Sequence, residues 1–208
     1  MSVSPEGGVT SGKIIYPFHP GYISGNWYNP LGAITVSGVS GNPAINTIKS
    51  FPFVCPSPVS ITTVACRVVV DSAGTNVQFA IYSANPTTLK PTGNPLSSTA
   101  SLLLTGTAGT NPSVAYSNAV DMKAGNLYWF ACNIDSNTPT FATACGGFSM
   151  LPALIGSSTQ TNNFAGAGVT WTGYSTAQTF GTWPDLTAAS FTDVTSSSII
   201  PFINFKVA

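Results

Sequence analysis

The apolar positions of this chain fall into short runs of bulky side chains, each bounded by Gly, Asn, Asp or Pro. The densest run, residues 127–132, reads Leu-Tyr-Trp-Phe-Ala-Cys and does not alternate polar with apolar residues. A run without alternation is typical of a strand that is covered on both faces. Turns at residues 123–125 and 135–139 flank it, and the apolar segment 140–144 follows. The sequence therefore predicts paired antiparallel strands at the centre of a core.

Further strands are predicted on both sides of this centre. Residues 77–82 alternate, with Val77, Phe79 and Ile81 on one face, as in a half-buried strand. The segment 85–95 carries three prolines and is expected to be a loop. Short strands separated by turn signals, without an amphipathic helix, predict an all-β fold, an antiparallel β-sandwich of the jelly-roll kind. The other segments expected to form strands are residues 31–39, 48–54, 59–70, 98–106 and 199–207.

The first part of the chain has a different composition, rich in Ser, Gly and Pro. Frequent prolines exclude a helix and make poor central strands. We therefore divide the chain into an extended N-terminal arm, residues 1–45, and a sandwich, residues 46–208. The arm either lies across its own domain or docks on a neighbouring subunit, and the sequence leaves both open. Its aromatic residues are Tyr16, Phe18, Tyr22, Trp27 and Tyr28, and all of them except Tyr22 are taken as candidate assembly contacts.

Charged residues are scarce. Asp, Glu, Lys and Arg make up 6% of the 208 residues, against roughly 25% in an average soluble protein. Six basic and six acidic residues leave no net charge, and so no field that would attract nucleic acid or an anionic membrane. A net charge near zero favours association, so we expect a homo-oligomer. No membrane span is expected, because no apolar run approaches about 18 residues.

The four cysteines lie at positions 55, 66, 132 and 145, and their spacing matches no zinc motif. An even number keeps a disulfide interpretation open. The N-terminus lacks the basic start and apolar core of a secretory signal, so we expect free thiols in a reducing compartment. Cys66 and Cys132 lie in strand-like runs, where a thiol acts as a small apolar side chain.

Side chains suited to catalysis are few. His19 is the only histidine, and no G-x-S-x-G motif accompanies it. The aspartates lie mostly in turn contexts, where the side chain typically hydrogen-bonds the backbone. Neither a calcium-loop motif nor a glycine-rich strand-to-helix element occurs. We therefore expect no enzymatic activity, no catalytic residue, no metal and no cofactor.

One aromatic group remains as a candidate binding site. Trp171, Tyr174, Phe180 and Trp183 fall within thirteen residues of a Gly- and Thr-rich region. Aromatic rings among hydroxyl and amide groups suit the apolar faces and hydroxyl edges of sugars. Bulky aromatics are, however, more often buried in a core or a subunit interface. We take Trp171, Tyr174, Trp183 and Asp185 as candidate ligand contacts and leave both interpretations open.

Three parts of the chain together carry a recognisable pattern. They are residues 59–82 with 91–96, residues 123–133, and residues 178–193. This pattern resembles a β-rich domain of tailed-bacteriophage virion proteins of the tail-fibre, head-fibre and decoration type. The resemblance covers roughly residues 45–208, and its most distinctive part is the Phe-Gly-Thr-Trp-Pro sequence at residues 180–184.

The resemblance implies a non-enzymatic virion subunit, commonly a homotrimer, that is assembled in the host cytoplasm together with other virion proteins. The chain departs from a typical long fibre, because no heptads, collagen-like repeats or extended shaft precede the domain. The expected function is therefore a fibre or decoration subunit displayed on the particle, where it contacts the host surface. The alternative is a carbohydrate-binding or receptor-binding module at a tail-fibre tip, with a host surface glycan as its ligand.

Overall fold

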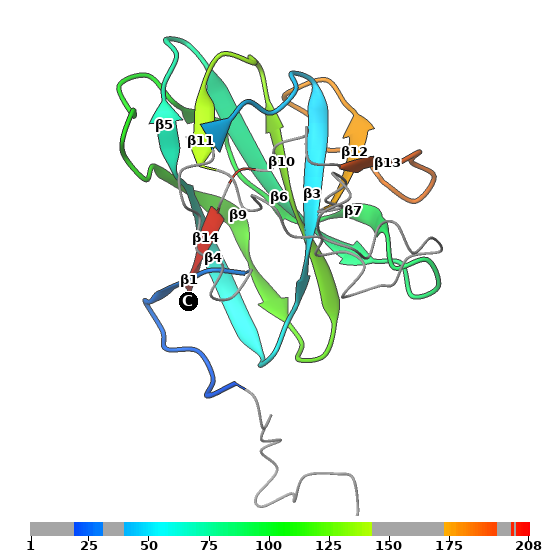
Figure 1. Cartoon of the computed structure of the whole chain (residues 1–208). Coiled ribbons are helices and arrows are strands. Elements are labelled where there is room, and N and C mark those ends of the chain that lie inside the picture. Colours follow the sequence, from blue (N-terminus) through cyan, green and yellow to red (C-terminus); the bar gives the residue numbers. More distant parts are fainter. Residues whose placement is uncertain (1–18, 31–39, 143–172, 195–200, 202) are drawn as a thin grey trace, which may run out of the picture.

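The protein is an all-β molecule, as predicted. The computed structural model describes residues 19–30, 40–142, 173–194, 201 and 203–208, and these form fourteen β-strands and no helix (Figure 1). All strand pairs are antiparallel. The described residues contain no helix long and apolar enough to cross a membrane.

Three sheets make up the fold. The large sheet has the strand order β13-β12-β3-β10-β6-β7, with β8 also paired to β6. Its strands are β3 (Thr47–Val54), β6 (Asn76–Ala84), β7 (Pro91–Ser98), β8 (Leu102–Leu103), β10 (Leu127–Ile134), β12 (Gly173–Ala177) and β13 (Thr192–Val194). The second sheet, β1-β14-β4-β9, is built from β1 (Trp27–Tyr28), β4 (Val59–Cys66), β9 (Ser113–Met122) and β14 (Ile203–Val207). The small third sheet, β2-β11-β5, is built from β2 (Ser40–Gly41), β5 (Val68–Val70) and β11 (Thr140–Ala142).

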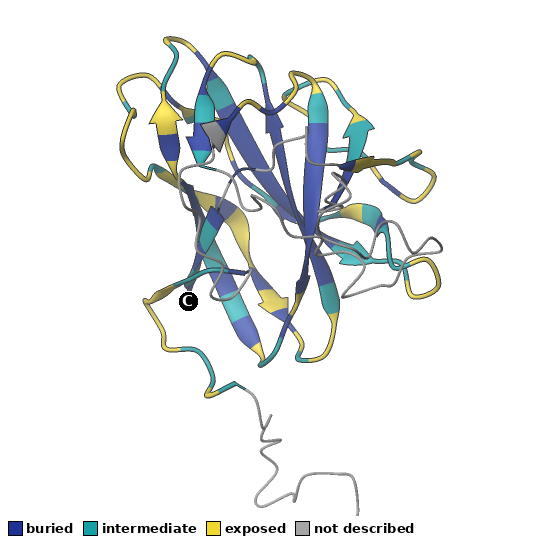
Figure 2. Ribbon diagram, viewed as in Figure 1, coloured by how far each residue is buried: buried dark blue, intermediate teal, exposed yellow. Residues whose placement is uncertain are grey.

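The large and second sheets pack face to face and enclose the main core. Phe53 and Phe130 of the large sheet lie with their ring centroids 5.7 and 5.9 Å from that of Phe205 in the second sheet. All three residues are buried. The strands β3 and β10 are mostly dark blue, the colour of buried residues, in Figure 2. Burial of such aromatic surface between two sheets is the main stabilising contribution in a β-sandwich. The predicted sandwich is therefore confirmed, while its jelly-roll connectivity stays a prediction.

Strand β10 lies at the centre of the large sheet, paired with β3 on one side and β6 on the other. Tyr128 and Phe130 face the main core, whereas Trp129 and Ala131 face a second cluster on the outer side of the sheet. The prediction of a strand covered on both faces is confirmed. Its predicted partner is wrong, because residues 140–142 pair with β2 and β5. β3 and β6 match β10 in length, whereas β11 has only three residues.

The predicted strand 59–70 is in fact two strands in two sheets. The chain leaves the second sheet after Cys66 and enters the third sheet at Val68. Arg67, at the break, is exposed, and its guanidinium donates a hydrogen bond to the Gly109 carbonyl. A charged residue between two buried ones therefore marks the position where the chain changes sheets.

The prediction that residues 77–82 form a half-buried strand is wrong, because both faces of β6 are buried. The inner face is apolar, as expected, but Ala80 and Tyr82 are also buried on the outer face. A segment distant in the sequence covers that outer face and includes Trp183 and Leu186. Local alternation could not predict this cover, because it depends on a contact across about 100 residues.

Prolines and chain ends account for the remaining differences. The predicted loop 85–95 ends at Pro91, where β7 begins as an outer strand of the large sheet, a position that tolerates proline. The predicted strand 98–106 is reduced to β8, which pairs with β6 near the sheet edge. The C-terminal strand is confirmed over residues 203–207, with alternate side chains buried. The predicted strand 31–39 lies outside the described residues.

Strand β9 connects the two large layers. Its register with β4 shifts between the pairs Ile61↔Val120 and Thr63↔Ala115, so several β9 residues lie opposite a single β4 position. Within this bulge Tyr116 forms an isolated bridge with Thr99, which follows β7 of the large sheet. β9 therefore belongs to the second sheet at both ends and touches the large sheet in the middle.

Phe130→Ala should lower the free energy of unfolding by about 3–5 kcal/mol. The substitution removes a ring that contacts Phe51, Phe53 and Phe205. Chemical denaturation followed by tryptophan fluorescence measures the change. Leu103→Ala is the control, because this side chain is 53% exposed, and it should change the free energy by less than about 0.5 kcal/mol. Equal effects of the two substitutions would contradict a core closed between two sheets.

Candidate functional site

Residues 178–191, here called the strap, run across the outer face of the large sheet without forming a strand. Several hydrogen bonds attach the strap, three of them between residues 180 and 186. The Leu186 backbone N–H donates to the Gly93 carbonyl at 2.9 Å. The Tyr82 hydroxyl donates to the Pro184 carbonyl at 3.0 Å, and the Phe180 backbone N–H donates to an Asn46 side-chain oxygen at 3.0 Å. The strap is therefore a fixed part of the fold.

Under the strap lies the second cluster, here called the outer cluster. It is formed by Ile48, Ala80, Tyr82, Trp129, Ala131, Tyr174 and Leu186, with Trp183 and Phe191 packed against it. The Trp129 and Tyr174 rings have centroids 5.3 Å apart, and Tyr82 meets Trp183 edge-on at 6.3 Å. The outer cluster gives the apolar outer side of β10 a cover that excludes water.

The structure brings three of the four candidate ligand contacts to this region. Tyr174 is only 3% exposed and lies beneath the amine of Lys90, which is 5.2 Å from its ring centroid. Trp183 is half-buried, and its indole N–H is buried and has no hydrogen-bond partner. Asp185 is exposed, and hydrogen bonds from Thr187 lower the pKa of its carboxyl. Trp171 lies outside the described residues.

The candidate assembly contacts divide in the same way. Tyr16 and Phe18 lie outside the described residues. Tyr28 is half-buried, with its ring stacked on Phe205 at 6.1 Å, and β1 extends the second sheet beside β14. Trp27 points the other way and is 43% exposed. Residues 19–30 thus lie on their own domain, and Trp27 is the described candidate that stays available to a neighbour.

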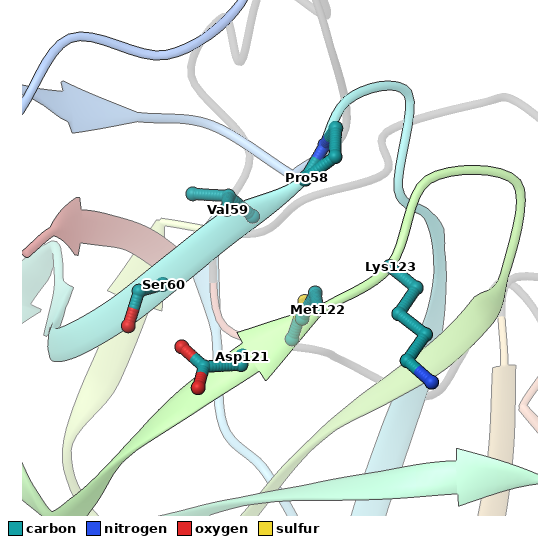
Figure 3. A pocket seen from close by; sticks show the side chains of 6 residues that line it. All are labelled: Pro58, Val59, Ser60, Asp121, Met122 and Lys123. Atoms are coloured by element: carbon teal, nitrogen blue, oxygen red, sulfur yellow. The ribbon is translucent and has the colours of Figure 1, made fainter. Parts of the chain in front are cut away.

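One pocket of about 430 Å³ lies at the end of the β4–β9 pair (Figure 3). Asp121 and Ser60 are paired across the two strands, and their side chains point toward each other at its mouth. Lys123 extends away from Asp121, and Met122 and Val59 supply an apolar wall. The described lining of the pocket carries one carboxylate, one hydroxyl and the Lys123 amine, which extends away from the other two.

Buried titratable side chains gather instead inside the sandwich. Lys49 is 6% exposed and lies opposite Cys132 across the β3–β10 pair. Burial lowers the pKa of the Lys49 amine and raises the pKa of the Cys66 and Cys132 thiols to about 12. Cys55, Cys66 and Cys132 are free and buried, so the expectation of thiols used as apolar side chains is confirmed for Cys66 and Cys132.

The side chains that could bind a metal are dispersed in the described part of the chain. The His19 ring packs at a tilt against that of Tyr22, with the centroids 4.5 Å apart, and its Nδ1 accepts a hydrogen bond from the Gly21 N–H. Among the described residues, no three His, Cys, Asp or Glu side chains lie together as metal ligands would. Lys49 was not singled out from the sequence, although a lysine between Ile48 and Phe51 in a predicted strand signals a charge in the core.

Lys49→Met should raise the free energy of unfolding near pH 7 by at least about 1 kcal/mol. Because burial lowers the amine pKa, the charged form is less stable in the folded chain than in the unfolded chain. This penalty applies in full below the lowered pKa and becomes small as the pH rises to about 10.4, the ordinary pKa of a lysine amine, above which both states are neutral. Denaturation curves at the two pH values should therefore show a gain that shrinks with pH.

The control is Lys123→Met, because Lys123 is exposed and should leave stability nearly unchanged at both pH values. A gain for Lys49→Met that is equally large at both pH values would mean that the extra apolar contact, and not the removed charge, stabilises the protein.

Comparison with known proteins adds no relative to these observations. No protein-family model matches the chain, and a search of curated proteins finds no match. A function can therefore be proposed only from the resemblance of its sequence segments and from the geometry described above.

Proposed function

We propose that this protein is a structural subunit of a tailed-phage virion, a fibre or decoration subunit displayed on the particle. One observation carries the proposal. The three segments that resemble phage virion proteins meet in the outer cluster, where Tyr82, Trp129 and Leu186 each come from a different segment. Tyr82 and Trp129 are direct cross-strand partners, and the Tyr82 hydroxyl is bonded to the strap. The resemblance thus concerns one physical unit of the fold.

The surface chemistry supports a role in which the subunit acts through contact. With 6% charged residues and no net charge, copies placed side by side experience little electrostatic repulsion. Exposed apolar side chains, including Ile23 and Trp27 in the arm, can add apolar contact area between subunits. The proposal includes that the subunit forms a homotrimer and that this homotrimer assembles with other virion proteins.

The alternative function is a glycan-binding module that uses the aromatic group near the strap, and the contacts of that group favour it less. Sugar-binding aromatics present an open ring face to the ligand. Tyr174 is buried against Trp129 and Phe191, and Trp183 packs on Tyr82. These contacts favour a structural role for the two rings.

Antibodies raised against the purified chain should label particles produced from the genome that encodes it. Mass spectrometry of purified particles should find the chain at a fixed copy number relative to the major capsid protein. Particles from a strain with the gene deleted serve as the control for antibody specificity. A chain that accumulates in the lysate but is absent from washed particles would contradict the virion role.

The arm offers a second test of the same proposal, since we propose that it anchors the subunit to its neighbours. Contacts of the described arm with its own domain include the Tyr22 and Tyr28 rings against Phe205. Deleting residues 1–18 keeps these contacts and should reduce incorporation into particles. Deleting residues 1–30 should also lower stability, because Phe205 loses both rings.

Two point variants refine this test. Trp27→Ala should reduce incorporation while the domain stays folded, because the side chain is exposed in the isolated chain. Tyr28→Ala should lower stability instead, because the ring packs on Phe205. Normal incorporation of both the 1–18 deletion and the Trp27→Ala variant would remove the arm from the assembly mechanism.

A further inference from the structure

A second cavity, of about 440 Å³, lies where β6 ends and β10 begins. The loop that follows β6 forms one side of it, and the turn that precedes β10 forms the other. Its size falls within the range of roughly 300–1,000 Å³ that is typical of small-molecule sites. The side chains that matter for its chemistry are Ser83, Asn85, Leu89, Asn126, Leu127 and Tyr128.

The polar side chains of this cavity have unused hydrogen-bonding groups. Among the described residues, neither the Ser83 hydroxyl nor the Asn126 carboxamide makes a hydrogen bond. The Asn85 side-chain oxygen accepts bonds from the Thr87 and Thr88 N–H groups, both at 2.9 Å. This arrangement fixes the Asn85 carboxamide and leaves its NH₂ group available. The cavity can therefore both donate and accept hydrogen bonds without losing any bond that holds the fold.

The loop wall is held in place before any ligand arrives. Leu89 has a φ of 60°, a left-handed conformation that is uncommon for a residue with a side chain. Its N–H donates to the Asn85 carbonyl at 2.8 Å, and its carbonyl accepts the Trp129 indole N–H at 2.9 Å. A conformation of this kind costs on the order of 1–3 kcal/mol and persists where the surroundings impose it, often at ligand sites. The buried Trp129 thus fixes the wall that carries Leu89.

The lining identifies the class of ligand. None of the described residues that line the cavity is charged, and Leu89 and Leu127 supply apolar surface beside the hydroxyl and two carboxamides. A matching ligand is neutral, carries several hydroxyl groups and has an apolar face. We propose that this cavity is a saccharide-binding site that takes one sugar ring of a surface glycan. The site is separate from the aromatic group near the strap, and only its biological setting, contact with a host surface, rests on the proposed function.

Titration of the isotope-labelled full chain with free neutral sugars, followed by amide NMR shifts, tests the proposal. The probes are D-glucose, D-galactose and N-acetyl-D-glucosamine, together with the purified surface polysaccharide of the host. At least one probe should shift the backbone amides of Ser83, Asn126 and Leu127. Asn126→Ala should weaken binding about five- to tenfold, the loss expected for one hydrogen bond. The affinities for the free sugars and for the polysaccharide are compared. Only the polysaccharide offers many copies of the sugar ring, so a higher affinity for it would identify the polymer as the ligand source.

Asn111→Ala is the matched control. Asn111 is also an exposed loop asparagine, it makes no side-chain hydrogen bond among the described residues, and it does not line the cavity. This variant should bind every probe like the unmodified chain. The proposal is overturned if no probe shifts the cavity amides, or if Asn126→Ala and Asn111→Ala bind equally well.

These outcomes are independent of the virion role. A chain that is present on particles but binds no probe would refute only the saccharide site. A chain that binds a sugar through Asn126 but is absent from particles would refute only the virion role.

Discussion

The fold depends on one constraint, namely that β10 is apolar on both faces and must be covered twice. Phe130 and its neighbours on the inner face require the second sheet, and Trp129 on the outer face requires the strap. Neither cover is local, since the C-terminal strand supplies Phe205 and the strap supplies Leu186. The central strand therefore connects the two halves of the sequence, and the chain cannot bury β10 before its C-terminal third is in place.

Polar groups inside this structure are almost all neutral. The Ser50 hydroxyl donates to the Tyr174 carbonyl, and the Asn133 carboxamide donates to the Gln178 carbonyl. Hydroxyl and amide groups lose less hydration energy on burial than charged groups do, so they can link strands to each other and to the strap at little cost. In the described part of the chain, Lys49 is the exception, a buried amine. The scarcity of charge in the sequence thus extends from the surface into the core.

Local patterns were sufficient to predict β3, β6, β10 and β14, because each is rich in bulky apolar side chains, which in β10 form an uninterrupted run. They could not predict the partners of β10, since pairing depends on strands that match its length from distant parts of the chain. The strap was also beyond local reasoning: residues 180–186 have no period, and the burial of Leu186 and the partial burial of Trp183 arise from packing on the outer cluster. The sequence located the aromatic group of the candidate site, but it left open whether these rings face the sheet or a ligand.

The cavity beside β10 escaped sequence reasoning for a related reason. Ser83, Asn85 and Asn126 are common loop and turn residues, and nothing in their spacing brings positions 85 and 126 together. Their proximity follows from the register of β6 against β10, which places Ser83 opposite Tyr128. Residues that stabilise a turn and residues that bind a ligand therefore look alike in sequence, and only the pairing of strands separates them.

The bulge of β9 has a consequence for crowding. An open sheet edge invites a strand from another molecule and can propagate into uncontrolled polymers. Tyr116, within the bulge, is bridged to Thr99, so backbone groups between the two layers are already paired within the molecule. Because paired groups cannot accept a foreign strand, this stretch offers no template for pairing between molecules that are packed at high concentration.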